Sequence, residues 1–274
     1  MRGMQFSENL RPPTEWPPNP STARPISSIV GVLAFGLIAV FVAIVGWANG
    51  MPAAGRYGLL FAFFMFSTAV FAYLYSIRTP TSIDDIHTST DGTVIRYSLP
   101  ISGVLVLIIV VITIFCLGGA VEIFLATGGG SGSGGAIIPG VFGIYLATFS
   151  VDLVSGRLKR GVVVLSPKGI RQRGWSFESY LPWESVAGGT AAFHDSRVVL
   201  VIGYSNAKWE RRNTTRLWRI DRLPPVPMIQ LDCRKFDVDP IVLYHLVTFY
   251  ANNPDARAEL GTAAPLERVR TSTF

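Results

Sequence analysis

Four long apolar runs in the first 153 residues constrain the fold of this chain more than any other feature. Residues 28–48, 58–77 and 134–151 contain no Asp, Glu, Lys or Arg, and Asp152 follows the last of these runs. The remaining run, 101–127, contains only Glu122. A helix needs about 20 residues to cross a hydrocarbon core of about 30 Å. The runs therefore predict four transmembrane helices within a membrane domain at 28–155. These helices are expected at 28–48, 58–77, 101–127 and 134–153.

The composition agrees with a membrane protein that also has a polar part. Charged residues make up 15% of the 274 residues, against about 25% in an average soluble domain. The first 153 residues hold six Lys/Arg and seven Asp/Glu, whereas residues 154–274 hold eighteen and eleven. Two cysteines, Cys116 and Cys233, are too few for a disulfide scaffold, and we expect both to be reduced.

Basic residues at the ends of the apolar runs predict the orientation of the chain. They lie in the N-terminal segment, in the middle loop 78–100 and after the fourth run, whereas the first and third connections contain only Arg56. The positive-inside rule then places both termini in the cytoplasm. Arginine outnumbers lysine 20 to 4, and Ala, Gly and Pro are abundant. This composition indicates a bacterial source, so the predicted location is the bacterial inner membrane, crossed several times.

The two ends of the chain are predicted to be flexible. Residues 1–27 contain six prolines and few aliphatic residues, which indicates a disordered cytoplasmic tail. The pairs Pro12-Pro13 and Pro17-Pro18 leave open a second interpretation, a proline-rich ligand for an aromatic groove. Residues 253–274 are expected to form a flexible tail.

Residues 156–252 have the pattern of a β-rich domain that ends in a helix. Short β-branched or alternating runs predict strands. Asp239-Pro240 provides a cap and a first-turn proline for a helix with an apolar face. The predicted class is therefore an α+β membrane protein. The strand candidates are 161–166, 170–175, 180–186, 197–204, 215–220 and 228–231.

Two segments of this domain resemble the bacterial pleckstrin-homology-like (PH-like) family. They are Leu165-Ser166-Pro167-Lys168-Gly169-Ile170 and Leu181-Pro182-Trp183-Glu184-Ser185-Val186. The resemblance implies a β-barrel or sandwich over 156–252, closed by the C-terminal helix, and a role in binding lipid headgroups or proteins. The basic stretch 208–222 and the prolines of 223–227 depart from the family pattern. Gly169 is predicted to be a turn glycine with positive φ, and Trp183 a core anchor.

Arginines interleaved with tryptophans form the principal candidate site. Indoles favour the headgroup level of a bilayer, and guanidinium groups pair with anionic lipid. The alternative is a solvated hairpin whose charge complements nearby Asp and Glu. Nucleic acid is not expected as a partner, since the sequence has no base-reading motif. The candidate lipid- or partner-binding residues are Arg157, Lys159, Arg160, Lys208, Trp209, Arg211, Arg212, Arg216, Trp218, Arg219 and Arg222.

Other polar clusters give weaker indications of function. The middle-loop cluster Asp84, Asp85, His87 and Asp91 lacks calcium-loop spacing, so neither a metal nor another cofactor is expected. Glu122 could serve ion movement, although no basic partner is predicted within the membrane. The sequence predicts no catalytic residues. We expect a non-enzymatic membrane protein that binds anionic lipid headgroups or a membrane protein partner. The alternative is a small transporter, or an accessory subunit of a membrane transport or assembly complex.

Overall fold

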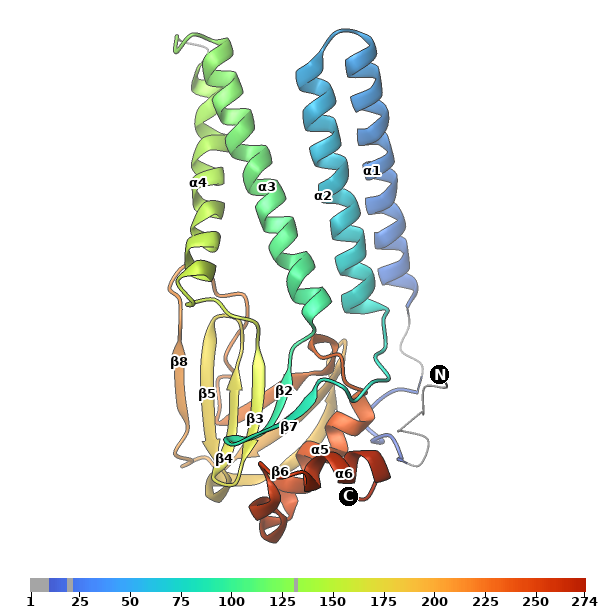
Figure 1. Cartoon of the computed structure of the whole chain (residues 1–274), viewed down its shortest axis with the longest axis vertical. Helices are drawn as coiled ribbons and strands as arrows, with labels where there is room; N and C mark the ends of the chain where they lie inside the picture. Colours follow the sequence, from blue (N-terminus) through green and yellow to red (C-terminus); the bar gives the residue numbers. More distant parts are fainter. Residues whose placement is uncertain (1–9, 19–21, 131–132) are drawn as a thin grey trace. The chain divides into compact units, whose positions relative to one another are not determined.

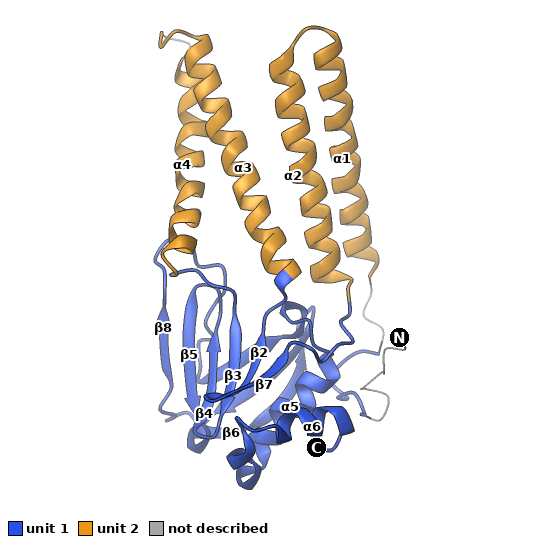
Figure 2. Cartoon of the chain, in the orientation of Figure 1, with its two compact units in different colours: residues 1–20, 79–99, 157–274 blue, residues 21–78, 100–156 orange. Residues whose placement is uncertain are grey.

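The computed structural model (Figure 1) divides into two compact units, which Figure 2 shows in different colours. It describes residues 10–18, 22–130 and 133–274. One unit, here called the helical unit, comprises residues 21–78 and 100–156. The other, here called the polar unit, comprises residues 1–20, 79–99 and 157–274. Each unit is therefore built from segments that are far apart in the sequence.

Four helices long and apolar enough to cross a membrane confirm the predicted spans. The structure extends three of them at the N-terminal end, because Pro52 starts the second helix as a first-turn proline and the N-terminal helix already begins at Ala23. The chain is thus a multi-pass membrane protein by the length and composition of its helices. The four are α1 (Ala23–Ala48), α2 (Pro52–Ser76), α3 (Leu99–Ala126) and α4 (Gly134–Val154).

Small residues let the helices of each hairpin approach closely. A Cβ atom added at Gly58 of α2 would lie 2.9 Å from the Ala43 Cβ and 3.1 Å from the Ala39 carbonyl oxygen of α1. A Cβ at Gly143 of α4 would lie 2.7 Å from Leu117 of α3. Such contacts supply the dispersion energy that holds helices together in lipid. Small residues therefore bring the two helices together in both hairpins.

The larger sheet of the polar unit is antiparallel and takes strands from both sides of the second helical hairpin. Its order is β1-β2-β3-β4-β5-β8. Strand β2, which precedes α3, pairs with β3, which follows α4, in the register Ile95 to Val163. The strands are β1 (Ile86–Ser89), β2 (Gly92–Arg96), β3 (Val162–Ser166), β4 (Gly169–Arg173), β5 (Phe177–Pro182) and β8 (Glu210–Asn213).

A second, three-stranded sheet has the order β6-β7-β9 and is covered by α5. Helix α5 can approach β6 closely because Gly189 has no side chain. A Cβ atom added there would lie only 2.9 Å from the Thr248 side chain of α5. Asp239 caps α5 by accepting a hydrogen bond from the Ile241 amide, as predicted. The elements are β6 (Val186–Phe193), β7 (Arg197–Gly203), β9 (Met228–Asp232), α5 (Pro240–Asn252) and α6 (Ala264–Thr271), with short 3₁₀ turns at Trp183–Ser185, Cys233–Lys235 and Pro254–Glu259.

The α+β class is confirmed, but a closed barrel over 156–252 is wrong. The described strands form two sheets, and the larger one requires β1 and β2 from the middle loop 78–100. The sequence prediction treats this loop as a connection, because its acidic and polar residues mask two short strands. Ile86 and Ile95 nevertheless lie in the core. The polar domain therefore begins before the third span.

Local predictions within the polar unit fail where burial depends on tertiary contacts. Residues 215–220 form no strand, whereas Val186–Phe193 forms a strand of which only Val186 belongs to a predicted one. Gly169 does not have positive φ. It is a glycine because a Cβ would lie 2.6 Å from the Leu181 carbonyl oxygen of β5. Trp183 is a core anchor as predicted, and its indole donates a 2.6 Å hydrogen bond to the Ser166 carbonyl.

Both predicted tails are structured where the structure describes them. Pro13 and Trp16 of the N-terminal segment are buried, and residues 23–27 belong to α1. Residues 1–9 and 19–21 lie outside the described residues. At the other end, Leu260 and Val269 are buried. Glu259 accepts a 2.9 Å hydrogen bond from the Tyr250 hydroxyl of α5 and pairs with Arg268 of α6. This contact fastens the C-terminal helix.

The Glu259 contact predicts a pH dependence of stability. Burial raises the pKa of this carboxyl, but hydrogen bonds from Arg268 and Tyr250 outweigh burial and leave the pKa below its ordinary value of 4.5. A lowered folded-state pKa stabilises the fold above the unfolded pKa, and the contribution is lost as pH falls below about 4.5. Glu259→Gln should lower the free energy of unfolding at pH 7 and reduce its decline between pH 5 and about 3, as measured by urea denaturation in detergent. An unchanged acid limb would contradict this role.

The pairing of β2 with β3 predicts unequal effects for two neighbouring residues. Ile95 is fully buried, whereas Val94 points to the opposite, half-exposed face. Ile95→Ala should lower the free energy of unfolding by about 2–5 kcal/mol. Val94→Ala serves as the control and should cost clearly less. Equal effects in urea denaturation of the detergent-solubilised chain would show that the middle loop does not contribute to the core.

Candidate membrane-contact site

The structure separates the eleven predicted site residues into three groups within the polar unit. The first group follows α4, the second lies in or beside the edge strand β8, and the third lies in the segment after β8. The groups differ in how their charges are used. In chain order they are Arg157, Lys159 and Arg160; Lys208, Trp209, Arg211 and Arg212; and Arg216, Trp218, Arg219 and Arg222.

Arg160 makes contacts within the polar unit and is only partly exposed. Its guanidinium Nε donates a hydrogen bond to the Tyr97 carbonyl oxygen, and its Nη2 lies 3.9 Å from an Asp85 carboxylate oxygen. These contacts join the segment before α3 to the segment after α4, next to the pairing of β2 with β3. Arg157 and Lys159, by contrast, are exposed.

The arginines of the group at β8 interact with neighbouring side chains, which offset much of their positive charge. Arg212 donates hydrogen bonds of 2.6 and 2.9 Å to Glu178 of β5, which also pairs with Arg173 at 2.7 Å. Arg211 lies 4.7 Å above the Trp209 ring, and the indole of Trp209 donates to the Ser179 hydroxyl at 2.7 Å. The alternative that the sequence left open, a hairpin whose charge complements nearby carboxylates, describes this strand well.

The third group lies in a fixed loop, residues 214–222, here called the arginine loop. At its start, the Thr214 amide donates to the Ser176 carbonyl at 2.9 Å. The Thr214 hydroxyl donates to the Arg157 carbonyl at 2.7 Å. Both partners are backbone atoms, so the loop entry is fixed by the framework of the unit rather than by mobile side chains.

Asp221 fixes the other end of the arginine loop. Its buried carboxylate accepts a 2.8 Å hydrogen bond from the Trp175 amide. The same carboxylate forms a 2.5 Å ion pair with the Lys235 ammonium group. The Asp221 backbone also exchanges hydrogen bonds of 3.4 Å with the Ser176 hydroxyl. A buried carboxylate with two charge-assisted or amide donors is a strong anchor. The loop is therefore held at both ends, with its middle turned outward.

The middle of the arginine loop presents cations beside apolar side chains. The Leu217 side chain is 60% exposed and the Ile220 side chain is 37% exposed. Arg216, Arg219 and Arg222 are exposed. Among the described residues these three arginines form no ion pair, whereas Arg212 in β8 does. Trp218 is half-buried, and its amide lies 3.4 Å from the Thr215 hydroxyl.

The chain itself limits how far the arginine loop can lie from the end of α4. Arg157, whose carbonyl accepts the Thr214 hydrogen bond, is three residues after Val154, the last residue of α4. Three residues span at most about 11 Å. The arginines are recognisable from the sequence, whereas the roles of Thr214 and Asp221, which hold them in place, are not. Asp221 is the one acidic residue within 214–222, and this was the available signal for its role.

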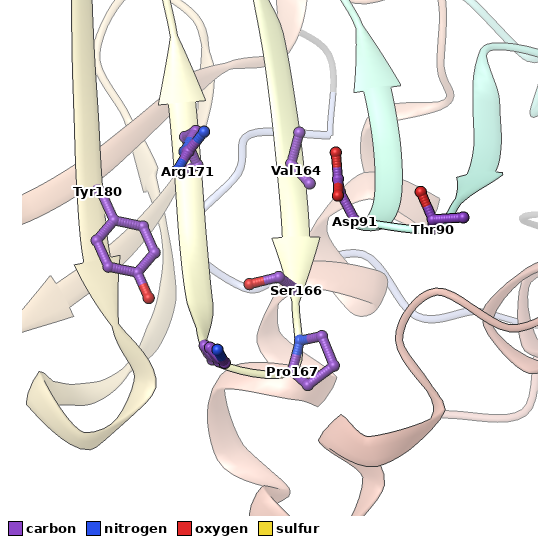
Figure 3. Close-up of a pocket in the computed structure, with 8 residues that line it drawn as sticks. Thr90, Asp91, Val164, Ser166, Pro167, Arg171 and Tyr180 are labelled. Carbon is purple, nitrogen blue, oxygen red and sulfur yellow. The ribbon is translucent and has the colours of Figure 1, made fainter.

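The outer face of the larger sheet contains an open concavity of about 480 Å³, shown in Figure 3. Arg171 and Tyr180 line it, with the guanidinium carbon 5.9 Å from the ring centre. Asp91 lies on the opposite side of the concavity from these two residues (Figure 3). The Ser166 hydroxyl donates to the Gly169 carbonyl at 2.8 Å and so closes the turn between β3 and β4. None of the residues that line the concavity belongs to the arginine loop.

The weaker candidates from the sequence have local partners. Glu122 pairs at 2.7 Å with Arg56, which corrects the prediction that it has no basic partner. The prediction placed Arg56 in a loop, whereas it lies in α2. Within the described residues, no three His, Cys, Asp or Glu side chains gather into a metal-binding group.

Comparison of the chain with protein-family models, with curated proteins and with solved structures finds no match.

The anchors of the arginine loop predict a change in proteolysis. Asp221→Asn removes the charge that pairs with Lys235, so the loop should open more often and expose Arg216, Arg219 and Arg222 to trypsin. Cleavage after these residues should become at least about tenfold faster, which corresponds to about 1.4 kcal/mol of lost local stability. Asp255→Asn, at an exposed position, is the control and should leave the rate unchanged. A rate for Asp221→Asn equal to that of the control would show that the carboxylate does not hold the loop.

Proposed function

We propose that this chain is a non-enzymatic, multi-pass membrane protein whose polar unit binds anionic lipid headgroups through the arginine loop. The observation that carries the proposal is the 2.7 Å hydrogen bond from Thr214 to the carbonyl of Arg157, three residues beyond the end of α4. The bond ties a loop whose arginines form no ion pair within the described part of the chain to the point where the chain leaves the last span. Where α4 crosses a bilayer, lipid headgroups surround that point.

The chemistry of the loop suits the boundary between lipid and water. Apolar side chains such as Leu217 and Ile220 gain free energy by leaving water, and neighbouring arginines pair with phosphate oxygens. Each basic residue near an anionic surface contributes about 1 kcal/mol. The three arginines of the loop would therefore add about 3 kcal/mol at low salt. Arg157 and Lys159 can add to this attraction, since both are exposed.

The assembly of the polar unit supports one topology for the chain. The unit combines the N-terminal segment, the middle loop and the C-terminal region. If α1 to α4 cross a bilayer, these three segments must lie on the same side of it. The distribution of Lys and Arg favours the cytoplasmic side of a bacterial inner membrane.

The PH-like resemblance fits this proposal but does not carry it. A β-rich unit with a helix after its last strand is compatible with such a domain, and folds of this kind serve many binding roles. A protein partner at the membrane surface is the alternative occupant of the same loop. The experiment below separates the two, because only lipid binding depends on bilayer composition when no other protein is present.

The test places the whole chain in nanodiscs of neutral or 30% anionic lipid. Leu217→Cys is labelled with an environment-sensitive fluorophore, and lipids with brominated acyl chains serve as quenchers. The two native cysteines are buried, so the introduced thiol reacts selectively. We expect quenching that increases with anionic lipid and decreases with salt.

A matched pair of charge variants decides whether the arginine loop is responsible. Removing Arg216, Arg219 and Arg222 by triple alanine substitution should abolish the dependence on anionic lipid. The control removes the same charge from the outer sheet face, at Arg96, Lys168 and Arg171, and should retain it. Equal loss in both variants, or no quenching in anionic nanodiscs, would overturn the proposal.

A further inference from the structure

A short segment near the N-terminus is held on the polar unit by specific contacts. The Trp16 amide donates a 3.2 Å hydrogen bond to the Pro13 carbonyl, which closes a turn. Pro13 and Trp16 are both buried, whereas Thr14 and Glu15 between them are exposed. The turn thus presents a proline and a tryptophan, three positions apart, to the same surface.

The tryptophan makes the closest contacts with that surface. Trp16 is only 5% exposed, and its indole Nε1 donates a 2.9 Å hydrogen bond to the Ala192 carbonyl of β6. The Tyr244 ring of α5 packs edge-on at 5.7 Å. The Arg197 guanidinium of β7 lies 5.8 Å from the indole centre. A buried indole with a satisfied N–H, an aromatic neighbour and a cation over its face is a well-determined contact.

Two further features show that the surface is adapted to this occupant. The Nε2 atom of His245 donates a 2.9 Å hydrogen bond to the Arg11 carbonyl and so fixes the start of the segment. The Arg197 Nε is buried and has no hydrogen-bond partner among the described residues. The face of the Trp16 ring gives this guanidinium a cation–π contact on the buried side of the segment. Strand β6 is an edge strand of its sheet, so the Ala192 side of the sheet is open to a ligand.

We propose that the surface formed by Ala192, Arg197, Tyr244 and His245 is a docking site for a proline-flanked tryptophan turn, filled in cis by residues 10–18 of the same chain. Prolines lower the entropic cost of binding, because the free segment is already restricted. Among the described residues, the segment pairs with no strand and forms no disulfide, so only side-chain contacts and single hydrogen bonds hold it in the site. A withdrawn segment would therefore leave a site for any peptide of the same chemistry. This inference is independent of the arginine loop.

A peptide-binding experiment tests the site. The chain without residues 1–18, in detergent micelles, is titrated against a fluorescently labelled synthetic peptide of residues 10–18. We expect saturable binding by anisotropy. A peptide with Trp16→Ala should bind at least about tenfold more weakly, because buried tryptophans dominate such contacts. A peptide with Thr14→Ala, changed at an exposed position, should bind like the native sequence. The intact chain, whose site is filled, should bind the labelled peptide more weakly than the shortened chain.

Three outcomes would overturn the proposal. One is equal binding of the native and Trp16→Ala peptides. Another is no saturable binding to a shortened chain whose thermal unfolding matches that of the intact chain. The third is conversion of dimers of the intact chain into monomers when the peptide is added, as measured by light scattering. This result would show that the segment binds a second copy of the chain.

A second variant tests the site if the shortened chain does not fold. Tyr244→Ala in the intact chain removes one wall of the tryptophan site and should raise deuterium uptake in residues 10–18. Uptake in β3 and β4 should stay unchanged and serves as the internal control. Unchanged uptake in residues 10–18 would show that the segment does not depend on this surface.

Discussion

The pairing of β2 with β3 is the contact on which the rest of the polar unit depends. It joins strands separated by two membrane-spanning helices, and it places Ile95 and Val163 in one core. Arg160 reinforces the joint through its hydrogen bond to the Tyr97 carbonyl. The outer hairpin of β1 and β2 gains the support of four further strands, since two strands alone are marginally stable in water. The framework that holds the arginine loop is built on this joint.

Sequence reasoning located the membrane helices because their signal is local. An apolar run of about 20 residues has few alternative explanations. The same reasoning identified the cap of α5 at Asp239 and the core role of Trp183. It missed β1 and β2 because their buried positions, such as Ile86 and Ile95, are interrupted by polar residues. Only the partner strand from beyond α4 makes those positions a core, and no local pattern contains that information.

The candidate site shows the same division between local and tertiary information. The basic residues could be recognised from the sequence, but their roles could not. Arg160 supports a backbone carbonyl, Arg212 is neutralised by Glu178, and Arg219 is left without an ion pair among the described residues. The difference comes from Thr214 and Asp221, whose backbone and carboxylate contacts turn the loop outward. Composition therefore indicates that a basic surface exists, while the anchoring contacts determine which cations remain available.

Because the larger sheet combines strands from before α3 and from after α4, folding of the polar unit depends on how many times the chain has crossed the bilayer between them. Strands β1 and β2 leave the ribosome before α3 and α4, and β3 leaves after them. An even number of crossings between β2 and β3 returns the chain to the side of the membrane on which β2 lies, so that β3 can pair with it. A single crossing separates the two strands by the whole membrane and leaves Ile95 without a core. A mis-inserted molecule is thus an unfolded one, and cellular proteolysis can recognise an error of membrane topology as an ordinary failure of a soluble domain to fold.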